Sequence, residues 1–271
     1  MKTETGDHDT VKMALIIIVL AALLLAATFL ALLPSGSDAA ELDKETKAAI
    51  IDSVRFHLDK TYIFAETAEK MGKALSKNLK KGKYDDLDDM DAFTRRLTED
   101  MEEISHDRHL WVFPATEEEI RIARQDAPSD DDREMRLTRA AYTNFGFEKV
   151  ERLEHNIGYL KFNQFSDAKY GGATAVAAMN FLANCYAVII DLRENGGGSP
   201  TMVQLISSYF FDEATHLNNF YIREADTIKQ FWTQSHIQGP SLADKPLYIL
   251  TARRTFSGAE EFTYNMKNLE R

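Results

Sequence analysis

From residue 136 to residue 271 the chain alternates between strand-like and helix-like segments, which leaves few architectures open. The segments FEKVERL, IGYLKF and AVIIDLR have the length and apolar content of strands, whereas GATAVAAMNFLAN and TMVQLISSYFF have helical spacing. NNFYIRE and KPLYILT are further strand-like segments, and a last helix is predicted from near Ser257. Strands that alternate with helices indicate a largely parallel sheet covered on both faces. Residues 136–271 are therefore predicted to form an α/β domain.

Residues 41–113, which precede this domain, have helical periodicity. Apolar residues recur at three- and four-residue spacing in KAAIIDSVRFHLDK, FAETAEKMGKALSKNLKKG and DMDAFTRRLTEDMEEI. Gly82 follows two lysines, as expected where a helix ends. We predict a small helical bundle here. Residues 114–135 are acidic and contain Pro128, so they are predicted to be a linker that can contain one or two helical turns and in which the run Asp130–Asp132 is solvated.

An uncharged apolar segment of 21 residues, Met13 to Leu33, lies near the amino terminus. It has about the length that is needed to cross the hydrocarbon core of a bilayer, so membrane contact through residues 13–33 is predicted. Lys2 and Lys12 precede the segment and acidic residues follow it, which places the rest of the chain outside the cytoplasm. We expect residues 1–40 to form a cytosolic tail and a single-pass anchor in the cell membrane. Cleavage near Ser37-Asp38-Ala39 would instead give a periplasmic or secreted protein.

The composition narrows the range of partners. The formal net charge of −11 argues against a surface that follows nucleic-acid phosphates, so no nucleic-acid partner is predicted. The single cysteine, Cys185, lies in an apolar context and is predicted to be a buried thiol without a disulfide or a nucleophilic role. The chain has neither the GxxxxGK[ST] nor the GxGxxG pattern, and His106 and His109 lack a third ligand of clear spacing. No cofactor and no metal site are predicted.

Two turns between a strand and a helix contain residues with catalytic potential. The first, DLRENGGGSP, holds Gly197 and Gly198 after an apolar strand. It is either a plain tight turn or a place where backbone N–H groups stabilise an oxyanion. The second, TFSGAEEF, contains Ser257. The pattern Ser-Gly-Ala-Glu matches a capping box, and a helix start also suits a nucleophile with the Gly258 N–H beside it.

A serine nucleophile needs a base, and the segment SHDRHLWVF offers His106 and His109. It lies where the helical part ends and a strand-like stretch begins. The chain's other histidines are less suitable, because they lie in the predicted cytosolic tail, on a helix face or in loops.

Three segments together resemble one family. SHDRHL, the stretch from NFGFEKVERLEHNIGYLKFNQF to DLRENGGG, and TARRTFSGAEEF are similar, in order, to the carboxyl-terminal processing (tail-specific) serine peptidases. The closest branch contains the interphotoreceptor retinoid-binding protein repeats and the tricorn protease core. The likeness covers about Ile50 to Arg271. It implies a ClpP/crotonase-like fold that hydrolyses peptides or proteins, with Ser257 as nucleophile and His109 as base. It also implies an oxyanion hole at Gly258 and either Gly197 or Gly198.

The chain also departs from the family's pattern. The linker is too short for the PDZ domain of the Ser-Lys branch, which favours a histidine base. The branch's orienting glutamate and next strand would follow Arg271, so the resemblance implies a catalytic domain that is incomplete at its carboxyl terminus. Either the sequence is a fragment of a longer reading frame, or its product is inactive unless completed. A noncatalytic module of the same fold, which holds a hydrophobic ligand, is the alternative.

Overall fold

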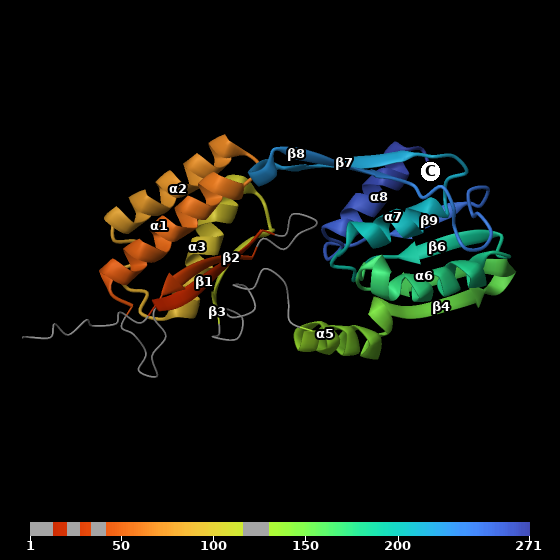
Figure 1. Cartoon of the computed structure of the whole chain (residues 1–271), viewed down its shortest axis with the longest axis horizontal. Coiled ribbons are helices and arrows are strands. Elements are labelled where there is room, and N and C mark those ends of the chain that lie inside the picture. Colours follow the sequence, from red (N-terminus) through yellow and green to blue (C-terminus); the bar gives the residue numbers. More distant parts are fainter. Residues whose placement is uncertain (1–12, 21–27, 34–41, 116–129) are drawn as a thin grey trace, which may run out of the picture. The chain divides into compact units, whose positions relative to one another are not determined.

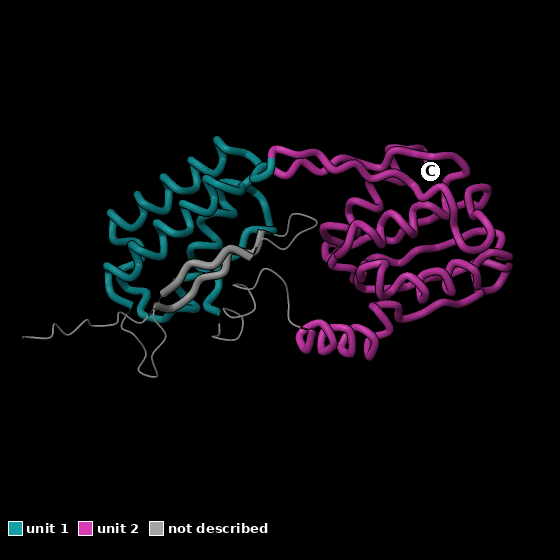
Figure 2. The backbone as a smooth tube through the Cα atoms, in the orientation of Figure 1, with its two compact units in different colours: residues 1–129, 223–225 teal, residues 130–222, 226–271 magenta. Residues whose placement is uncertain are grey.

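The computed structural model describes residues 13–20, 28–33, 42–115 and 130–271. The chain divides into two units (Figures 1 and 2). Unit 1 comprises residues 1–129 together with Arg223–Ala225, and unit 2 comprises Asp130–Ile222 and Asp226–Arg271. Each unit contains its own cluster of buried apolar side chains.

Unit 1 contains the three predicted helices, which are confirmed as α1 (Lys44–Thr61), α2 (Ala65–Lys80) and α3 (Met90–Ser105). The predicted apolar stripes of these helices form the core of the unit. Its fully buried members include Ile50, Val54, Leu58, Met71, Leu75, Phe93, Leu97 and Met101. Strand β3 (Leu110–Ala115) follows α3 and packs against it.

A buried carboxylate joins α2, α3 and the loop between them. Asp100 is 3% exposed. It accepts hydrogen bonds from Tyr84 Oη at 2.6 Å and Asn78 Nδ2 at 2.8 Å, and Arg96 lies 2.7 Å away. A buried charge is tolerated when its lone pairs are satisfied in this way. The network fixes α3, whose end leads directly to the candidate base.

The apolar segment near the amino terminus differs from its prediction. Residues Met13–Leu20 form strand β1 and Thr28–Leu33 form strand β2, in an antiparallel sheet of order β2-β1-β3. The run Ile16–Val19 is entirely β-branched, which favours extended backbone over helix. Among the residues that the structure describes, no helix is both long and apolar enough to cross a membrane. The predicted cytosolic residues 1–12 and the cleavage-like Ser37-Asp38-Ala39 lie outside the described ranges.

The end of the predicted linker is helical, which the prediction of one or two helical turns allowed. Helix α5 (Asp130–Tyr142) begins inside it, while residues 116–129 lie outside the described ranges. The acidic run forms the first turn of α5, where carboxylates are stabilised by the positive end of the helix dipole. Asp132 is buried, contrary to the expected solvated run.

Unit 2 has a four-stranded sheet of order β4-β5-β6-β9. Its strands are β4 (Phe147–Leu153), β5 (Ile157–Phe162), β6 (Ala187–Asp191) and β9 (Leu247–Leu250), and its longer helices after α5 are α6 (Ala168–Leu182), α7 (Pro200–Ser208) and α8 (Gly258–Asn268). Short 3₁₀ turns, η1 (Asn144–Gly146) and η2 (Glu154–Asn156), precede β4 and β5. The predicted alternation of strands and helices is confirmed, and β5, β6 and β9 are parallel.

Two strand pairs of unit 2 are antiparallel, because their connections are too short for a crossover helix. Strand β4 turns into β5 through His155 and Asn156, which both have positive φ, at 59° and 60°. Strands β7 (His216–Ile222) and β8 (Thr227–Trp232) form a hairpin with η3 (Arg223–Ala225) at its turn. NNFYIRE therefore supplies most of a strand, as predicted, but this strand pairs in the hairpin and not in the main sheet.

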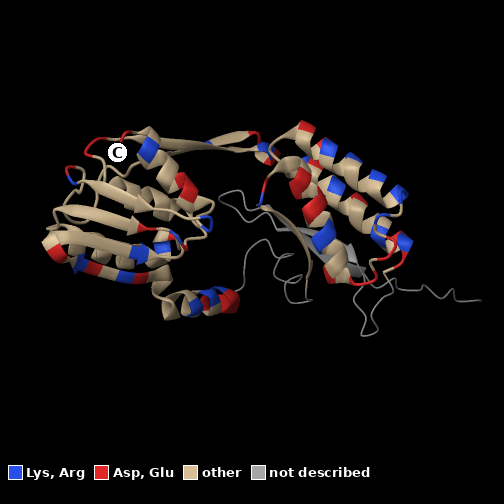
Figure 3. Ribbon diagram, turned by 180° about the vertical axis from the view of Figure 1, so that it is seen from behind, with Lys and Arg blue, Asp and Glu red and all other residues tan. Residues whose placement is uncertain are grey.

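The sheet was predicted to be covered by helices on both faces. Among the described elements, helices cover only one face of the main sheet. Leu160, Val188 and Ile190 point to the face that is buried in a common core with α6, α7 and α8. Side chains on the other face are more accessible: Tyr159 and Ile189 are partly exposed and Tyr248 is 60% exposed. Figure 3 looks onto this face.

Candidate active site

His109, the candidate base, lies in unit 1 between α3 and β3. Helix α3 ends at Ser105 and is capped by His106, which has a left-handed conformation (φ 52°) and an exposed side chain. The next strand is tied to the helix by Thr98 Oγ1, which accepts a hydrogen bond from the Val112 N–H at 2.9 Å. The side chain of His109 is 26% exposed. The fold thus holds His109 at the surface on a short, firmly attached turn.

Asp107 is hydrogen-bonded to His109 within this turn. Its Oδ1 lies 2.8 Å from His109 Nδ1 and accepts the His109 backbone N–H at 2.9 Å. Its Oδ2 accepts from Tyr62 Oη at 3.2 Å. Burial raises the pKa of Asp107, but the hydrogen bonds from His109 and Tyr62 outweigh it, so the pKa is lowered. Sequence reasoning missed this residue, although an aspartate two positions before a turn residue is a common local acceptor.

The glycine turn after β6 is held in conformations that favour glycine. Gly197 has φ 93° and Gly198 has φ 139°. A Cβ on Gly198 would lie 2.3 Å from the Phe165 carbonyl oxygen, and a Cβ on Gly197 would lie 2.6 Å from the Gly258 nitrogen. The turn is therefore packed directly against the start of α8.

Asn195 anchors the glycine turn and was also missed. Its side chain is fully buried, donates to the Phe162 carbonyl at 2.9 Å and accepts from the Gly197 N–H at 2.8 Å. Its own carbonyl accepts from the Phe256 N–H at 3.1 Å, immediately before Ser257. The Asn195 side chain thus links β5 to the glycine turn, and its backbone carbonyl links the glycine turn to the serine turn. Buried polar groups that are satisfied in this way specify a unique arrangement.

Ser257 caps α8, but its backbone is not that of an ordinary cap. Its N–H donates to Glu260 Oε2 at 2.9 Å, as in the predicted capping box. Ser257 has φ 53° and ψ −121°, outside the regions that L-residues usually occupy. The caps of other helices in this chain, Asp43, Asp89, Asp167 and Ser199, all have negative φ and positive ψ. A strained residue between strand and helix is typical of a nucleophile turn.

Two backbone donors beside Ser257 remain available. Within the described chain, neither the Gly198 N–H nor the Gly258 N–H donates to another group, whereas the Gly197 N–H is bound by Asn195. A Cβ on Gly258 would lie 3.2 Å from the Gly198 nitrogen, so these two segments are adjacent. Of the two glycines that the sequence left open, the geometry favours Gly198 as the partner of Gly258.

Glu261 is a second unusual group in the first turn of α8. Burial raises its pKa to about 7, although Asn218 Nδ2 donates to its Oε1 at 2.5 Å. Its Oε2 is buried without a hydrogen-bond partner in the described structure. A carboxyl in this environment is protonated more readily than a solvated one.

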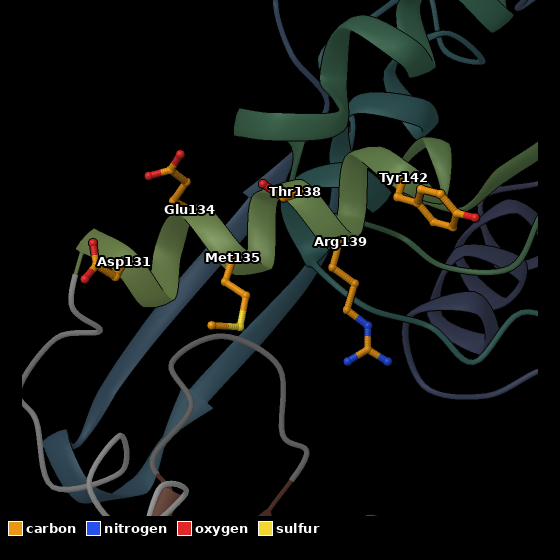
Figure 4. Close-up of a pocket in the computed structure, with 6 residues that line it drawn as sticks. All are labelled: Asp131, Glu134, Met135, Thr138, Arg139 and Tyr142. Carbon is orange, nitrogen blue, oxygen red and sulfur yellow. The ribbon is translucent and has the colours of Figure 1, made fainter.

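Two surface hollows do not include any of these residues. The hollow in Figure 4 is lined by one helix, α5, through Asp131, Glu134, Met135, Thr138, Arg139 and Tyr142. Met135 and Tyr142 are 69% and 92% exposed, so this is an open helix surface and not a built site. A hollow in unit 1 is lined by cations of α1, of α2 and of the residue that follows α2: Arg55, Lys73, Lys77, Lys80 and Lys81.

The structure therefore brings together Ser257, Gly258, Gly197 and Gly198 in unit 2, and it pairs His109 with Asp107 in unit 1. Among the described residues, no cluster of three or more His, Cys, Asp or Glu side chains could hold a metal ion. Cys185 is buried, and it belongs to the core of unit 2.

Comparison with solved structures gives distant matches. A photosystem II D1 C-terminal processing protease is 20% identical, with 42% of this chain and 28% of that chain covered and a TM-score of 0.35. A putative peptidase from Parabacteroides merdae is 17% identical over 83% of this chain and 72% of that one, with a TM-score of 0.48. A lipoprotein from Streptococcus agalactiae is 16% identical over 88% and 74%, with a TM-score of 0.43. This chain thus spans less than a third of the processing protease.

Comparison with family models is more informative. Residues 156–271 match the model of peptidase family S41. Residues 40–144 match the N-terminal domain of the same family as it occurs in eukaryotic interphotoreceptor retinoid-binding protein. The two matches together cover most of the chain: the N-terminal match includes α1, α2, α3, β3 and α5, and the peptidase match includes the elements from β5 to α8. The chain belongs to peptidase family S41.

Proposed function

We propose that this chain is a serine peptidase with a ClpP/crotonase-like catalytic unit, in which Ser257 is the nucleophile and His109 is the base. The observation that carries the proposal is the backbone of Ser257, because a helix cap needs no positive φ and a nucleophile turn does. The adjacent Gly198 and Gly258 N–H groups support it, since they can donate to an oxyanion. The substrate is a peptide or a protein.

The proposed reaction is an acyl transfer. Ser257 Oγ attacks the scissile carbonyl carbon while its proton passes to His109 Nε2. The carbonyl oxygen becomes an oxyanion and accepts hydrogen bonds from Gly198 and Gly258. His109 then gives the proton to the leaving amine, and water releases the acyl group by the same steps in reverse order. The reaction requires the side chains of Ser257 and His109 to come within hydrogen-bond reach of each other.

A serine-directed fluorophosphonate tests this function on the full chain. We expect an adduct on Ser257, located by mass spectrometry, and no adduct on Ser199, which caps α7 with ordinary backbone angles and is the internal control. His109→Ala should slow labelling by about 10²- to 10⁴-fold, because a positioned base contributes that much. A folded parent protein that does not label at Ser257 would overturn the proposal. It would favour the noncatalytic alternative, which can be examined by titration with an apolar fluorescent ligand.

Stability measurements on the same position separate a nucleophile turn from a simple cap. Ser257→Gly should abolish labelling and yet raise the free energy of unfolding of unit 2 by about 1–3 kcal/mol, because glycine relieves the backbone strain. A simple cap predicts the opposite sign, a loss of a few tenths of a kcal/mol for glycine and about 0.5–2 kcal/mol for Ser257→Ala. Urea unfolding of the parent and the two variants distinguishes these outcomes.

A further inference from the structure

We propose that Asp107 is the positioning acid of His109, so that the acidic member of the catalytic group lies in the same turn as the base. This inference rests on the proposed function. It replaces the expectation that the orienting acid follows Arg271 in the sequence.

The contacts of Asp107 hold both the backbone and the ring of His109. One oxygen of Asp107, Oδ1, lies 2.9 Å from the backbone nitrogen of His109 and 2.8 Å from its ring nitrogen Nδ1. The backbone contact closes a local turn, and the ring contact then fixes the side-chain rotation. Two restraints from a single oxygen define the direction of the imidazole.

Asp107 is itself held in place from two sides. Tyr62 Oη donates to Oδ2 at 3.2 Å, and the Asp107 N–H donates to Ser105 Oγ at 3.1 Å. Burial, with a further contribution from Asp107, raises the pKa of Tyr62 to about 12, so this hydroxyl remains a donor at neutral pH. Tyr62 lies at the end of α1 and Ser105 at the end of α3. The acid is therefore supported by two helices of unit 1.

The ionisation of Asp107 determines which ring nitrogen of His109 carries the proton. Because the hydrogen bonds from His109 and Tyr62 outweigh burial and lower its pKa, the Asp107 carboxyl is ionised at neutral pH and can only accept. Nδ1 must then donate, which makes Nε2 the nitrogen with the lone pair. That nitrogen can take the proton of Ser257 Oγ. Asp107 keeps its charge throughout and stabilises the imidazolium that forms.

The tautomer of His109 gives a test that does not require turnover. In the full chain labelled with ¹⁵N-histidine, long-range ¹H–¹⁵N NMR should show His109 mainly as the Nδ1–H form. Asp107→Asn should lower the share of this form, because a neutral amide oxygen is a weaker acceptor than a carboxylate. Asparagine still closes the local turn, so the variant is expected to fold. A parent His109 that is mainly Nε2–H, or a share unchanged in Asp107→Asn, would overturn the proposal.

Labelling rates test the consequence for Ser257. Asp107→Asn should slow fluorophosphonate labelling by about 10²- to 10⁴-fold, whereas Asp89→Asn should leave the rate unchanged. Asp89→Asn is the matched control: it makes the same charge change in unit 1 at the cap of α3, where asparagine caps equally well. Equal rates in the parent and Asp107→Asn would refute the positioning role. Failure of the parent to label would refute the proposed function instead, so the two failures are distinguishable.

Discussion

At the scale of single residues, Glu261 shows how burial controls a charge near Ser257. Its carboxyl is half-enclosed in the first turn of α8, and its only hydrogen bond in the described structure comes from Asn218. The neighbouring Glu260 is exposed and binds the Ser257 N–H. Two adjacent glutamates thus have different roles because one faces the interior and the other faces solvent.

The raised pKa of Glu261 predicts that the free energy of unfolding depends on pH. Its pKa is about 7 in the folded state and 4.5 in a solvated reference, so the folded state binds the proton more tightly. Proton binding to Glu261 therefore adds to the free energy of unfolding. This contribution is complete below pH 4.5, and up to about 3 kcal/mol of it is lost as the pH rises towards 7. Hydrogen exchange of β6 amides at several pH values should show this decline in the parent. Glu261→Gln should remove it, while the control Glu260→Gln should keep it. A decline that persists in Glu261→Gln would contradict the assignment.

At the scale of elements, the two strand-to-helix turns of unit 2 form one structure. The glycine turn before α7 and the serine turn before α8 are in backbone contact, and Asn195 is hydrogen-bonded to both. Thr255 adds a further tie, since its Oγ1 donates to the Leu192 carbonyl at 2.8 Å. The position of Ser257 therefore depends on the glycine turn as much as on its own helix.

Neighbouring glycines in this turn should respond differently to substitution. Gly197→Ala places a Cβ 2.6 Å from the Gly258 nitrogen at a positive φ, so backbone atoms must move. We expect a loss of about 2 kcal/mol or more in unfolding free energy and a loss of Ser257 labelling. Gly196→Ala is the control, because its Cβ would meet nothing within 4 Å. Native-like labelling in Gly197→Ala would show that the contact between the turns is not needed.

At the scale of the whole molecule, the proposed catalytic residues are divided between two units with separate cores. His109 and Asp107, the proposed base and its acid, belong to the part that matches the N-terminal domain of the family, and Ser257, the proposed nucleophile, belongs to the part that matches the peptidase domain. Neither unit alone contains both Ser257 and His109.

The location of the protein remains a prediction from the charges around residues 13–33. Lys2 and Lys12 precede the apolar run, so Ser257 should lie outside the cytoplasm. The test uses bacterial cells that express the chain, with a permeabilised outer membrane and an intact cytoplasmic membrane. Added protease should degrade the Ser257-bearing part, while a cytoplasmic control protein should be protected. Replacing both lysines with glutamate should reduce this exposure. Complete protection of the parent would contradict the predicted orientation.

Local sequence patterns were sufficient to predict most helices and strands of both units. The helices α1, α2 and α3 follow from apolar residues at helical spacing, and β4 and β5 coincide with the predicted segments, because both periodicities arise within a few residues of chain. The antiparallel pairing of β4 with β5 could also have been predicted from their short connection. For the amino-terminal run, length and hydropathy predicted a membrane segment, whereas the described residues form strands, which its β-branched residues favour.

The amino-acid sequence by itself determined the α/β order of unit 2, the helical part of unit 1 and the candidates Ser257 and His109. Only the tertiary structure decided that Gly198 and not Gly197 has an available N–H, that Ser257 has strained backbone angles, and that Asp107 binds Nδ1 of His109. The physical reason is the range of the interactions. Periodicity and capping depend on neighbours in the chain. Hydrogen-bond partners and backbone strain depend instead on residues that are distant in sequence, such as Asn195 for the turn of Ser257 and Tyr62 for Asp107.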